Sequence, residues 1–268
     1  MTCWVVVGMH AWVTTGKARF TCPRPCDGAG VVFLSNEIIM KSAFWARKAH
    51  KWIGLIIGVQ ALLWMISGVY MTVISLDIIH GDHLAHAHQQ PLVAPTHLSG
   101  EELQRRYSGM TQVKLKRLLE RDVYEIHAHD KIYLLDATTG HVLSPGDQQM
   151  AIALAKAVYQ GQAPVARVEW VTQAPQEVAT RPVPMWAVHY ADAGETTLYF
   201  SPYSGELLAR RHSLWRWFDF LWMFHIMDYE ARSDVNNTLL RVASAVGLVF
   251  VLSGAWLLFY SFRRRAAA

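Results

Sequence analysis

Two long apolar stretches frame the central part of the chain. Residues 52–76 contain no charged residue, and residues 239–262 contain only Arg241, which lies near the start of that stretch. As a helix, the first stretch would be roughly 37 Å long, which is enough to cross a bilayer with some tilt. The pattern therefore predicts two transmembrane helices, with Arg241 close enough to a membrane surface to extend into the headgroups.

The region between these stretches has the shorter periodicities of a small α+β domain. Ser99 followed by Glu102 predicts the start of a helix, and residues 146–161 predict a second helix. Alternating apolar residues predict two strands joined by a turn at 129–131, and a meander of three strands within 184–211.

A weak internal repeat runs through the same region. The segments "YLLDATTGHVLS" (133–144) and "LYFSPYSGELLA" (198–209) each contain a strand-like run, a polar turn closed by Gly140 or Gly205, and a second apolar run. We expect two copies of one helix-plus-hairpin unit, with the sheet faces covered by the helices.

Aromatic residues accumulate directly before the second apolar stretch. Trp215, Trp217 and Trp222 lie within residues 213–237, together with scattered charges. This composition is typical of an interfacial helix at the level of the lipid headgroups. We expect such a helix here, followed by a turn into the bilayer.

Basic residues lie at one end of each apolar stretch and indicate its orientation. They are Lys41, Arg47, Lys48, Lys51, Arg263, Arg264 and Arg265. By the positive-inside rule both termini are cytoplasmic, which places the central region in the periplasm of a bacterium and the protein in the inner membrane. These flanks explain much of the net charge of +4, so membrane lipid is the expected partner and nucleic acid is not.

The 3 cysteines all lie near the N-terminus. Cys22 and Cys26 have no second Cys or His pair to complete a zinc site. The residues before Met40 lack the order of a signal peptide, so we expect a disordered leader or an extension upstream of a start at Met40. The expected segments are 1–39 (this leader), 40–79 (cytoplasmic flank and first transmembrane helix), 80–212 (extracytoplasmic region), 213–237 (interfacial helix and turn) and 238–268 (second transmembrane helix and basic tail).

Several linked motifs are distributed over roughly residues 44–265. They are "AHKWIGL", "SGVYMTV", "IHGDHL", "DATTG", "SPYSGEL" and "WFDFLWMFHIMDY". Together they resemble the PepSY-associated transmembrane family, in its small form with two spans flanking one PepSY-like α+β region outside the membrane. The resemblance implies a role in iron acquisition, in which some members are haem-containing reductases of ferric iron or ferric siderophores.

Four histidines lie near the ends of the expected spans. They are His50 at the cytoplasmic end, and His80, His83 and His225 at the outer end. Ionisable residues at such positions are functional candidates, and two facing helical histidines can hold haem iron at both axial positions. We therefore expect a haem b held by His50 on the inner side, and an outer haem held by His225 with His80 or His83.

Glycines on the first span fit the same hypothesis. Gly54, Gly58 and Gly68 recur at helical spacing, which lets a flat macrocycle approach the backbone. Two spans enclose little volume, so we expect a homodimer whose spans form a four-helix bundle. The alternative that these glycines only form a helix-packing face stays open.

The histidines after the first span also have other interpretations. His80 and His83 flank Asp82, and with His225 this set forms a candidate metal site. The alternatives are a headgroup contact for His50 and an interfacial hydrogen bond for His225. Three further histidines are expected in a solvated loop: His86, His88 and His97.

Three functions remain open. The first is a haem b protein that transfers electrons across the membrane to ferric iron or a ferric chelate, as a ferric siderophore reductase would. Its electron donor is unidentified, because no dinucleotide-binding fingerprint is present. The second is a non-enzymatic PepSY regulator of an extracytoplasmic peptidase, which needs no membrane histidines. The third is a metal-binding accessory to a transporter. Hydrolysis is not expected, because no hydrolase nucleophile motif is present.

Overall fold

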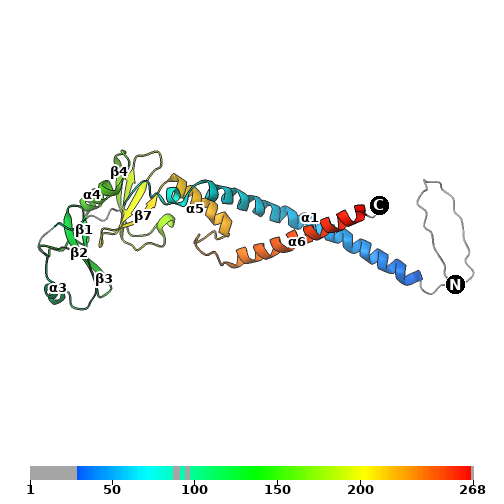
Figure 1. The fold of residues 1–268 in the computed structure, drawn as a ribbon, viewed down its shortest axis with the longest axis horizontal. Helices are drawn as coiled ribbons and strands as arrows, with labels where there is room; N and C mark the ends of the chain where they lie inside the picture. The colour runs from blue at the N-terminus through cyan, green and yellow to red at the C-terminus, as the bar shows by residue number, and fades with distance from the viewer. Residues whose placement is uncertain (1–28, 87–90, 94–96, 267–268) are drawn as a thin grey trace, which may run out of the picture. The chain divides into compact units, whose positions relative to one another are not determined.

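The computed structural model describes residues 29–86, 91–93 and 97–266 (Figure 1). The chain divides into two units, Met1–Ile53 and Gly54–Ala268. Helix α1 (Ala29–Val73) carries the boundary between them, and helix α6 (Thr238–Ala266) is the last element described. Each contains one segment long and apolar enough to cross a membrane, His50–Val73 in α1 and Thr238–Trp256 in α6. Both predicted membrane-length helices are therefore present.

The first apolar helix ends earlier than predicted. Helix α1 ends at Val73, and Ser75 is extended, with ψ 147°, before the short helix α2 (Leu76–His80) begins. The main-chain carbonyl of Ser75 accepts hydrogen bonds from the N–H groups of Ile78 and Ile79. The predicted end of this helix at residue 76 is therefore wrong. The break changes the chain direction before the histidine-rich segment.

A three-stranded antiparallel sheet follows. Helix α3 (Gly100–Arg106) begins as predicted, because the Ser99 side chain accepts a hydrogen bond from the Glu102 N–H. The strands, in sheet order, are β1 (Met110–Leu118), β2 (Arg121–Ala128) and β3 (Lys131–Asp136). The predicted turn between β2 and β3 is confirmed, and β1 was not predicted.

A four-stranded antiparallel sheet forms the second half of the domain. Helix α4 (Gln148–Val158) is capped by the Asp147 side chain, which accepts from the Met150 N–H. The strands, in sheet order, are β4 (Val165–Val171), β5 (Met185–Tyr190), β6 (Thr197–Phe200) and β7 (Leu207–Arg211). The predicted meander is β5–β6–β7, and β4 was not predicted.

Each sheet has its own helix and its own apolar core, as predicted. On the first sheet, Leu103 of α3 packs with buried residues of β2 and β3. On the second sheet, α4 supplies the buried residues Ala151, Leu154 and Ala155 to a cluster with Val188, Leu198 and Phe200. Burial of such apolar side chains is the main force that holds a helix on a sheet.

The turns of the predicted repeat have the same hydrogen-bond pattern. In the first turn, the Gly140 N–H donates to the Asp136 carbonyl, and the Asp136 N–H donates to the His141 carbonyl. In the second, Gly205 and Ser201 make the same first bond, and the Ser201 N–H donates to the Glu206 carbonyl. Both glycines have positive φ, 73° and 68°, which explains why glycine closes each turn. The prediction of a repeat is supported.

Candidate functional site

Helix α5 (Ser213–Ile226) lies along the C-terminal half of α1 (Figure 1). Near its start, the Leu214 carbonyl accepts a hydrogen bond of 2.9 Å from the Tyr70 hydroxyl. Near its end, the Phe224 carbonyl accepts one of 3.2 Å from the Gln60 amide. The two helices are therefore antiparallel, and α5 lies beside the apolar segment His50–Val73.

Side chains of α1 and of the turn before α6 satisfy the last carbonyl groups of α5. The Gln60 amide donates to the Phe224 carbonyl, and the Trp64 indole donates to the His225 carbonyl at 2.9 Å. The Asn237 amide, in the turn before α6, donates to the Ile226 carbonyl at 2.8 Å. Such carbonyls have no partner within their own helix, and in apolar surroundings each needs a donor. The end of α5 is thus fixed in place.

His225 is oriented by a hydrogen bond to α1. Its Nδ1 atom lies 2.8 Å from the Oγ atom of Ser67, a fully buried residue. The Ser67 hydroxyl donates its only proton to a carbonyl of its own helix, Leu63 at 2.8 Å or Trp64 at 3.1 Å. While that proton points to a carbonyl, Ser67 can only accept from His225, which requires the tautomer with the proton on Nδ1; when the hydroxyl turns to the ring, Ser67 donates to Nδ1 instead. In the neutral tautomer with the proton on Nδ1, the Nε2 atom has a lone pair that can bind a metal.

This arrangement depends on a polar stripe that the sequence interpretation missed. Gln60, Trp64 and Ser67 are spaced four and three residues apart, so they lie on one face of α1. The sequence does contain a signal for this stripe, because polar or amphipathic residues recur at helical spacing inside an apolar span. The stripe faces α5, and the Trp222 ring stacks on His225 from within α5, with ring centroids 6.2 Å apart.

The predicted outer ligands have other surroundings. His80 is the last residue of α2, and His83 lies in the following turn rather than on the helix end; both are exposed. The Asp82 carboxylate forms an ion pair with Arg210 of β7 at 3.0 Å. The described residues contain no group of three or more His, Cys, Asp or Glu side chains that could hold a metal ion. His80, Asp82, His83 and His225 are therefore not gathered into one such site.

A buried histidine that was not predicted joins α2 to α5. His212 precedes α5, and its Nε2 atom lies 3.1 Å from the Ile79 carbonyl. Its ring meets the His83 ring edge-on, with centroids 5.9 Å apart. Burial lowers the pKa of His212, which favours the neutral ring. His212 thus fixes the start of α5 beside α2.

The candidate glycines differ in their surroundings. A Cβ atom on Gly54 would lie 2.9 Å from the Phe250 ring of α6, so this glycine allows close contact between the helices. A Cβ atom on Gly58 or Gly68 would meet nothing within 4 Å. His50 lies on α1 in the unit Met1–Ile53, whereas the other candidate residues belong to the unit Gly54–Ala268.

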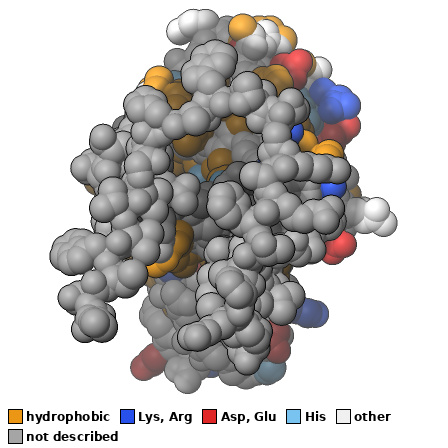
Figure 2. Space-filling model, turned by 90° about the vertical axis from the view of Figure 1, so that its right-hand side faces the viewer, with side chains coloured by type: hydrophobic (Ala, Val, Ile, Leu, Met, Phe, Trp, Pro, Cys, Tyr) orange, Lys and Arg blue, Asp and Glu red, His pale blue; other side chains and the backbone are white. Residues whose placement is uncertain are grey.

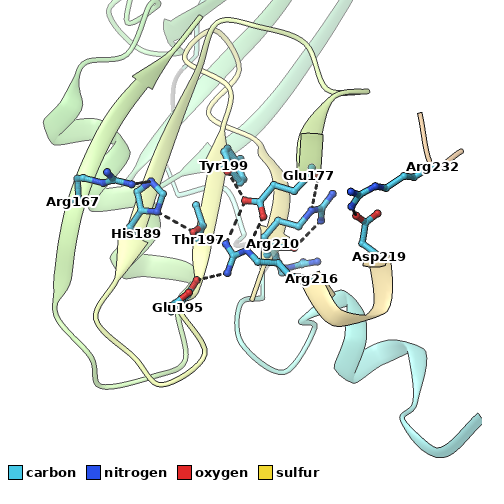
Figure 3. Close-up of polar contacts among 11 residues, drawn as sticks. Arg167, Glu177, His189, Glu195, Thr197, Tyr199, Arg210, Arg216, Asp219 and Arg232 are labelled. Carbon is cyan, nitrogen blue, oxygen red and sulfur yellow. Dashed lines mark hydrogen bonds and ion pairs between the residues drawn. The ribbon is translucent and has the colours of Figure 1, made fainter. Parts of the chain in front are cut away.

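A network of polar contacts fastens α5 to the four-stranded sheet (Figure 3). Its centre is Glu177 in the short 3₁₀ helix η1 (Gln176–Val178), whose carboxylate accepts from Arg216 at 2.8 Å and from the Tyr199 hydroxyl at 2.7 Å. Burial, reinforced by Glu177, raises the pKa of Tyr199, so this hydroxyl keeps its proton and donates. Helix α5 also carries Asp219, which pairs with Arg232 in the loop before α6.

A cavity of about 620 Å³ lies between the two sheets. Its apolar lining includes Leu118 of β1, Leu154 of α4 and Leu207 of β7. Charged residues also line it, namely Lys114, Lys116, Arg117, Arg210 and Glu206, and each of the four cationic side chains forms an ion pair with a carboxylate of the protein. Figure 2 shows one outer face of the molecule, on which charged side chains of both signs lie next to one another. The volume is within the range of small-molecule sites.

Two membrane-length helices and an α+β region, joined through α5, define a two-span membrane protein. The profile of the family described as PepSY-associated TM region matches residues 47–268, so the chain belongs to this family. The resemblance noted from the sequence motifs is thereby confirmed. No curated protein and no solved structure matches the chain.

Proposed function

We propose that this chain is a haem b protein of the bacterial inner membrane, which transfers electrons to ferric iron or a ferric chelate and so supports iron uptake. Haem iron changes between its ferric and ferrous states by one electron, and this is the chemistry that the group supplies when bound. The observation that carries the proposal is the orientation of His225, whose Nδ1 atom is hydrogen-bonded to Ser67. Histidine ligands are commonly oriented through the ring nitrogen that does not bind the metal.

The surroundings of His225 fit haem better than a bare ion. A bare ion such as zinc is held by three or four protein ligands, and the part of the chain that is described contains no group of three. The porphyrin supplies four ligands to its iron, so one or two histidines suffice. The metal-accessory hypothesis therefore has less support than the haem hypothesis.

The second axial ligand is proposed to come from a dimer. A second copy of the chain would present His80, His83 and His225 again across a symmetric interface. The open space at Gly58 and Gly68 leaves room for a macrocycle against α1. His50 is proposed to hold a second haem near the cytoplasmic end of the same helix, which would complete a path for electrons.

The α+β region is proposed to hold the electron acceptor in the periplasm. The cavity of about 620 Å³ between its sheets has an apolar lining with cationic residues. Ferric chelates that carry negative charge have matching chemistry, because their charge pairs with Lys and Arg and their organic part packs on apolar side chains.

Visible spectra of the purified protein test this proposal. The full chain is expressed in haem-replete cells, purified in detergent and measured before and after dithionite. We expect the sharp α-band of a low-spin b-type haem, which His225→Ala removes or halves. His141→Ala is the matched control, because His141 is exposed in the turn after β3 and far along the chain from α5.

The result that would overturn the proposal is a folded, haem-supplied protein without a haem spectrum. An unchanged spectrum in His225→Ala would remove the role of His225 while leaving haem binding itself. Ferric reduction is measured separately, by following a ferric chelate after the reduced protein is mixed with it. Failure to oxidise the haem under those conditions would reject the chelate as acceptor.

A further inference from the structure

A second, smaller cavity lies against the free edge of β7. Its volume is about 280 Å³, and all five positions of β7 line it, together with His80 and Asp82 near α2 and Arg181 after η1. Strand β7 is the last strand of its sheet. Alternate N–H groups of such an edge strand point away from the sheet and are available to a ligand.

Positive charge exceeds negative charge in this cavity. Its lining contains the guanidinium groups of Arg181, Arg210 and Arg211, and one carboxylate, Asp82. Asp82 is paired with Arg210 at 3.0 Å. The remaining two guanidinium groups have no carboxylate within the lining to balance them.

Two of these arginines have donors without a charged acceptor among the residues that the structure describes. Arg211 donates to two main-chain carbonyls, those of Glu177 at 2.6 Å and Arg210 at 2.7 Å. The Nε atom of Arg210 is buried and has no hydrogen-bond partner among the described residues. Unsatisfied buried donors are uncommon in proteins, because each loses its bonds to water, and a bound anion would satisfy this one.

Electrostatics around Arg211 agree with this arrangement. Burial lowers the pKa of Arg211 to about 10, and the neighbouring charge of Arg181 acts in the same direction. A guanidinium group at this pKa is still charged at neutral pH. The carboxylates of Glu177 and Asp219 act in the opposite direction and compensate part of this charge, and an anion in the cavity would stabilise it further.

The position of the cavity indicates where an anion would come from. His80 ends α2, and α2 begins just after the membrane-length segment His50–Val73. Lipid headgroups occupy the layer directly beyond the hydrocarbon core. The Arg211 guanidinium also lies 3.8 Å above the Trp215 ring centroid of α5, a helix of the aromatic type found at that level.

We propose that this cavity binds a phosphate group, supplied either by the headgroup of an anionic membrane lipid or by free phosphate. Arginine forks match the geometry of phosphate oxygens, and several of them around one anion give strong charge-assisted hydrogen bonds. The edge N–H groups of β7 add neutral donors. The site is separate from His225 and does not depend on haem.

Native mass spectrometry and calorimetry of the full chain in a non-ionic detergent test the proposal. The probes are phosphatidylglycerol, a galactosyl diacylglycerol with the same acyl chains but no phosphate, and sodium phosphate. The variants are Arg181→Gln and Arg210→Gln, with Arg105→Gln as the matched control, because Arg105 is exposed on α3 and does not line the cavity. Arg181 is the cleaner test, since no hydrogen bond or ion pair of its side chain is found among the described residues.

We expect one phosphatidylglycerol per chain to bind more tightly than the galactolipid, and Arg181→Gln to weaken this binding by about tenfold or more. Binding of sodium phosphate with the same dependence on Arg181, without a preference between the lipids, would support the site and identify free phosphate as the source. Equal binding in Arg181→Gln and Arg105→Gln, or no binding of either phosphate probe, would overturn the proposal.

Discussion

Arg216 of α5 forms a two-point ion pair with Glu177 of η1, with 2.8 Å between Nε and Oε2 and 3.4 Å between Nη2 and Oε1. The pair is partly buried, since the two side chains keep 34% and 19% of their exposure. The same carboxylate also accepts from the Tyr199 hydroxyl. This pair therefore joins the helix that carries His225 to the four-stranded sheet.

Replacing Arg216 tests how strongly this pair holds α5. In Arg216→Ala, Glu177 keeps Tyr199 as a donor but loses its cationic partner. We expect the free energy of unfolding in detergent to fall by about 1–3 kcal/mol, as for a lost hydrogen bond to a charged group. Arg105→Ala, which changes an exposed side chain of α3, should alter this free energy by less than about 0.5 kcal/mol. Equal effects of the two variants would show that the pair does not stabilise the domain.

Ser67→Ala tests the orientation of His225. The variant removes the hydrogen-bond partner of Nδ1 while keeping the ring. If His225 holds haem, loss of this partner should weaken haem binding by about 10–100-fold. Thr72→Ala is the control, because the Thr72 hydroxyl donates only to the Val69 carbonyl of its own helix. Haem titration of the apoprotein measures both, and equal affinities would exclude a role for Ser67.

Gly54 and Gly58 should respond differently to an added methyl group. Alanine favours a helix over glycine by about 1 kcal/mol, so Gly58→Ala, with open space around its Cβ, should be neutral or stabilising. Gly54→Ala places its Cβ 2.9 Å from the Phe250 ring. Because the ring must move, this variant should be less stable than Gly58→Ala by about 1–3 kcal/mol. Melting curves of the two variants in detergent measure this difference in stability. A Gly54→Ala variant as stable as Gly58→Ala would contradict the contact between α1 and α6.

The turn at Asp136 predicts a dependence of stability on acid pH. Hydrogen bonds from the Thr139 and Thr138 N–H groups hold the pKa of Asp136 below its ordinary value of 3.8, despite burial. Its contribution to stability is therefore complete above about that pH and is lost as the pH falls through the lower pKa of the folded state.

Serine can replace this aspartate, because Ser201 accepts the equivalent bonds from Tyr203 and Ser204 in the second turn. Asp136→Ser should keep the turn at pH 7, losing about 1 kcal/mol or less, and should lose less stability than the natural protein as the pH falls from about 5 to about 2. Asp136→Ala should be the less stable of the two variants at pH 7. Urea unfolding at each pH measures this, and identical pH profiles for the natural protein and the Asp136→Ser variant would refute the assignment.

Local patterns in the sequence predicted the long elements and the turns. The apolar spans, the capped helix after Ser99 and the glycine-closed turns each depend on neighbouring residues, and each is present in the structure. Strands β1 and β4, each at one edge of its sheet, were missed because neither has a clear alternation of apolar and polar residues. Their sequences, "MTQVKLKRL" and "VARVEWV", mix charged and apolar residues, since much of each strand faces solvent.

The surroundings of the candidate site could not be read in the same way. His225 and Ser67 are 158 residues apart in the chain, and no local period connects them. The histidine itself was selected as a candidate by its position, but its partner on α1 depends on how α5 packs. Asp82 was predicted to be a metal ligand, but it forms an ion pair with Arg210. That partner could not be foreseen from the sequence, because it lies 128 residues further along the chain, on β7.

Helix α5 is held at both ends, by Arg216 and Glu177 near its start and by Gln60 and Trp64 at its finish. A rod fixed in this way behaves mechanically as a strut, since a helix resists compression along its axis and its side-chain anchors resist sliding. Moving the four-stranded sheet relative to α1 therefore requires that one of these two sets of contacts break.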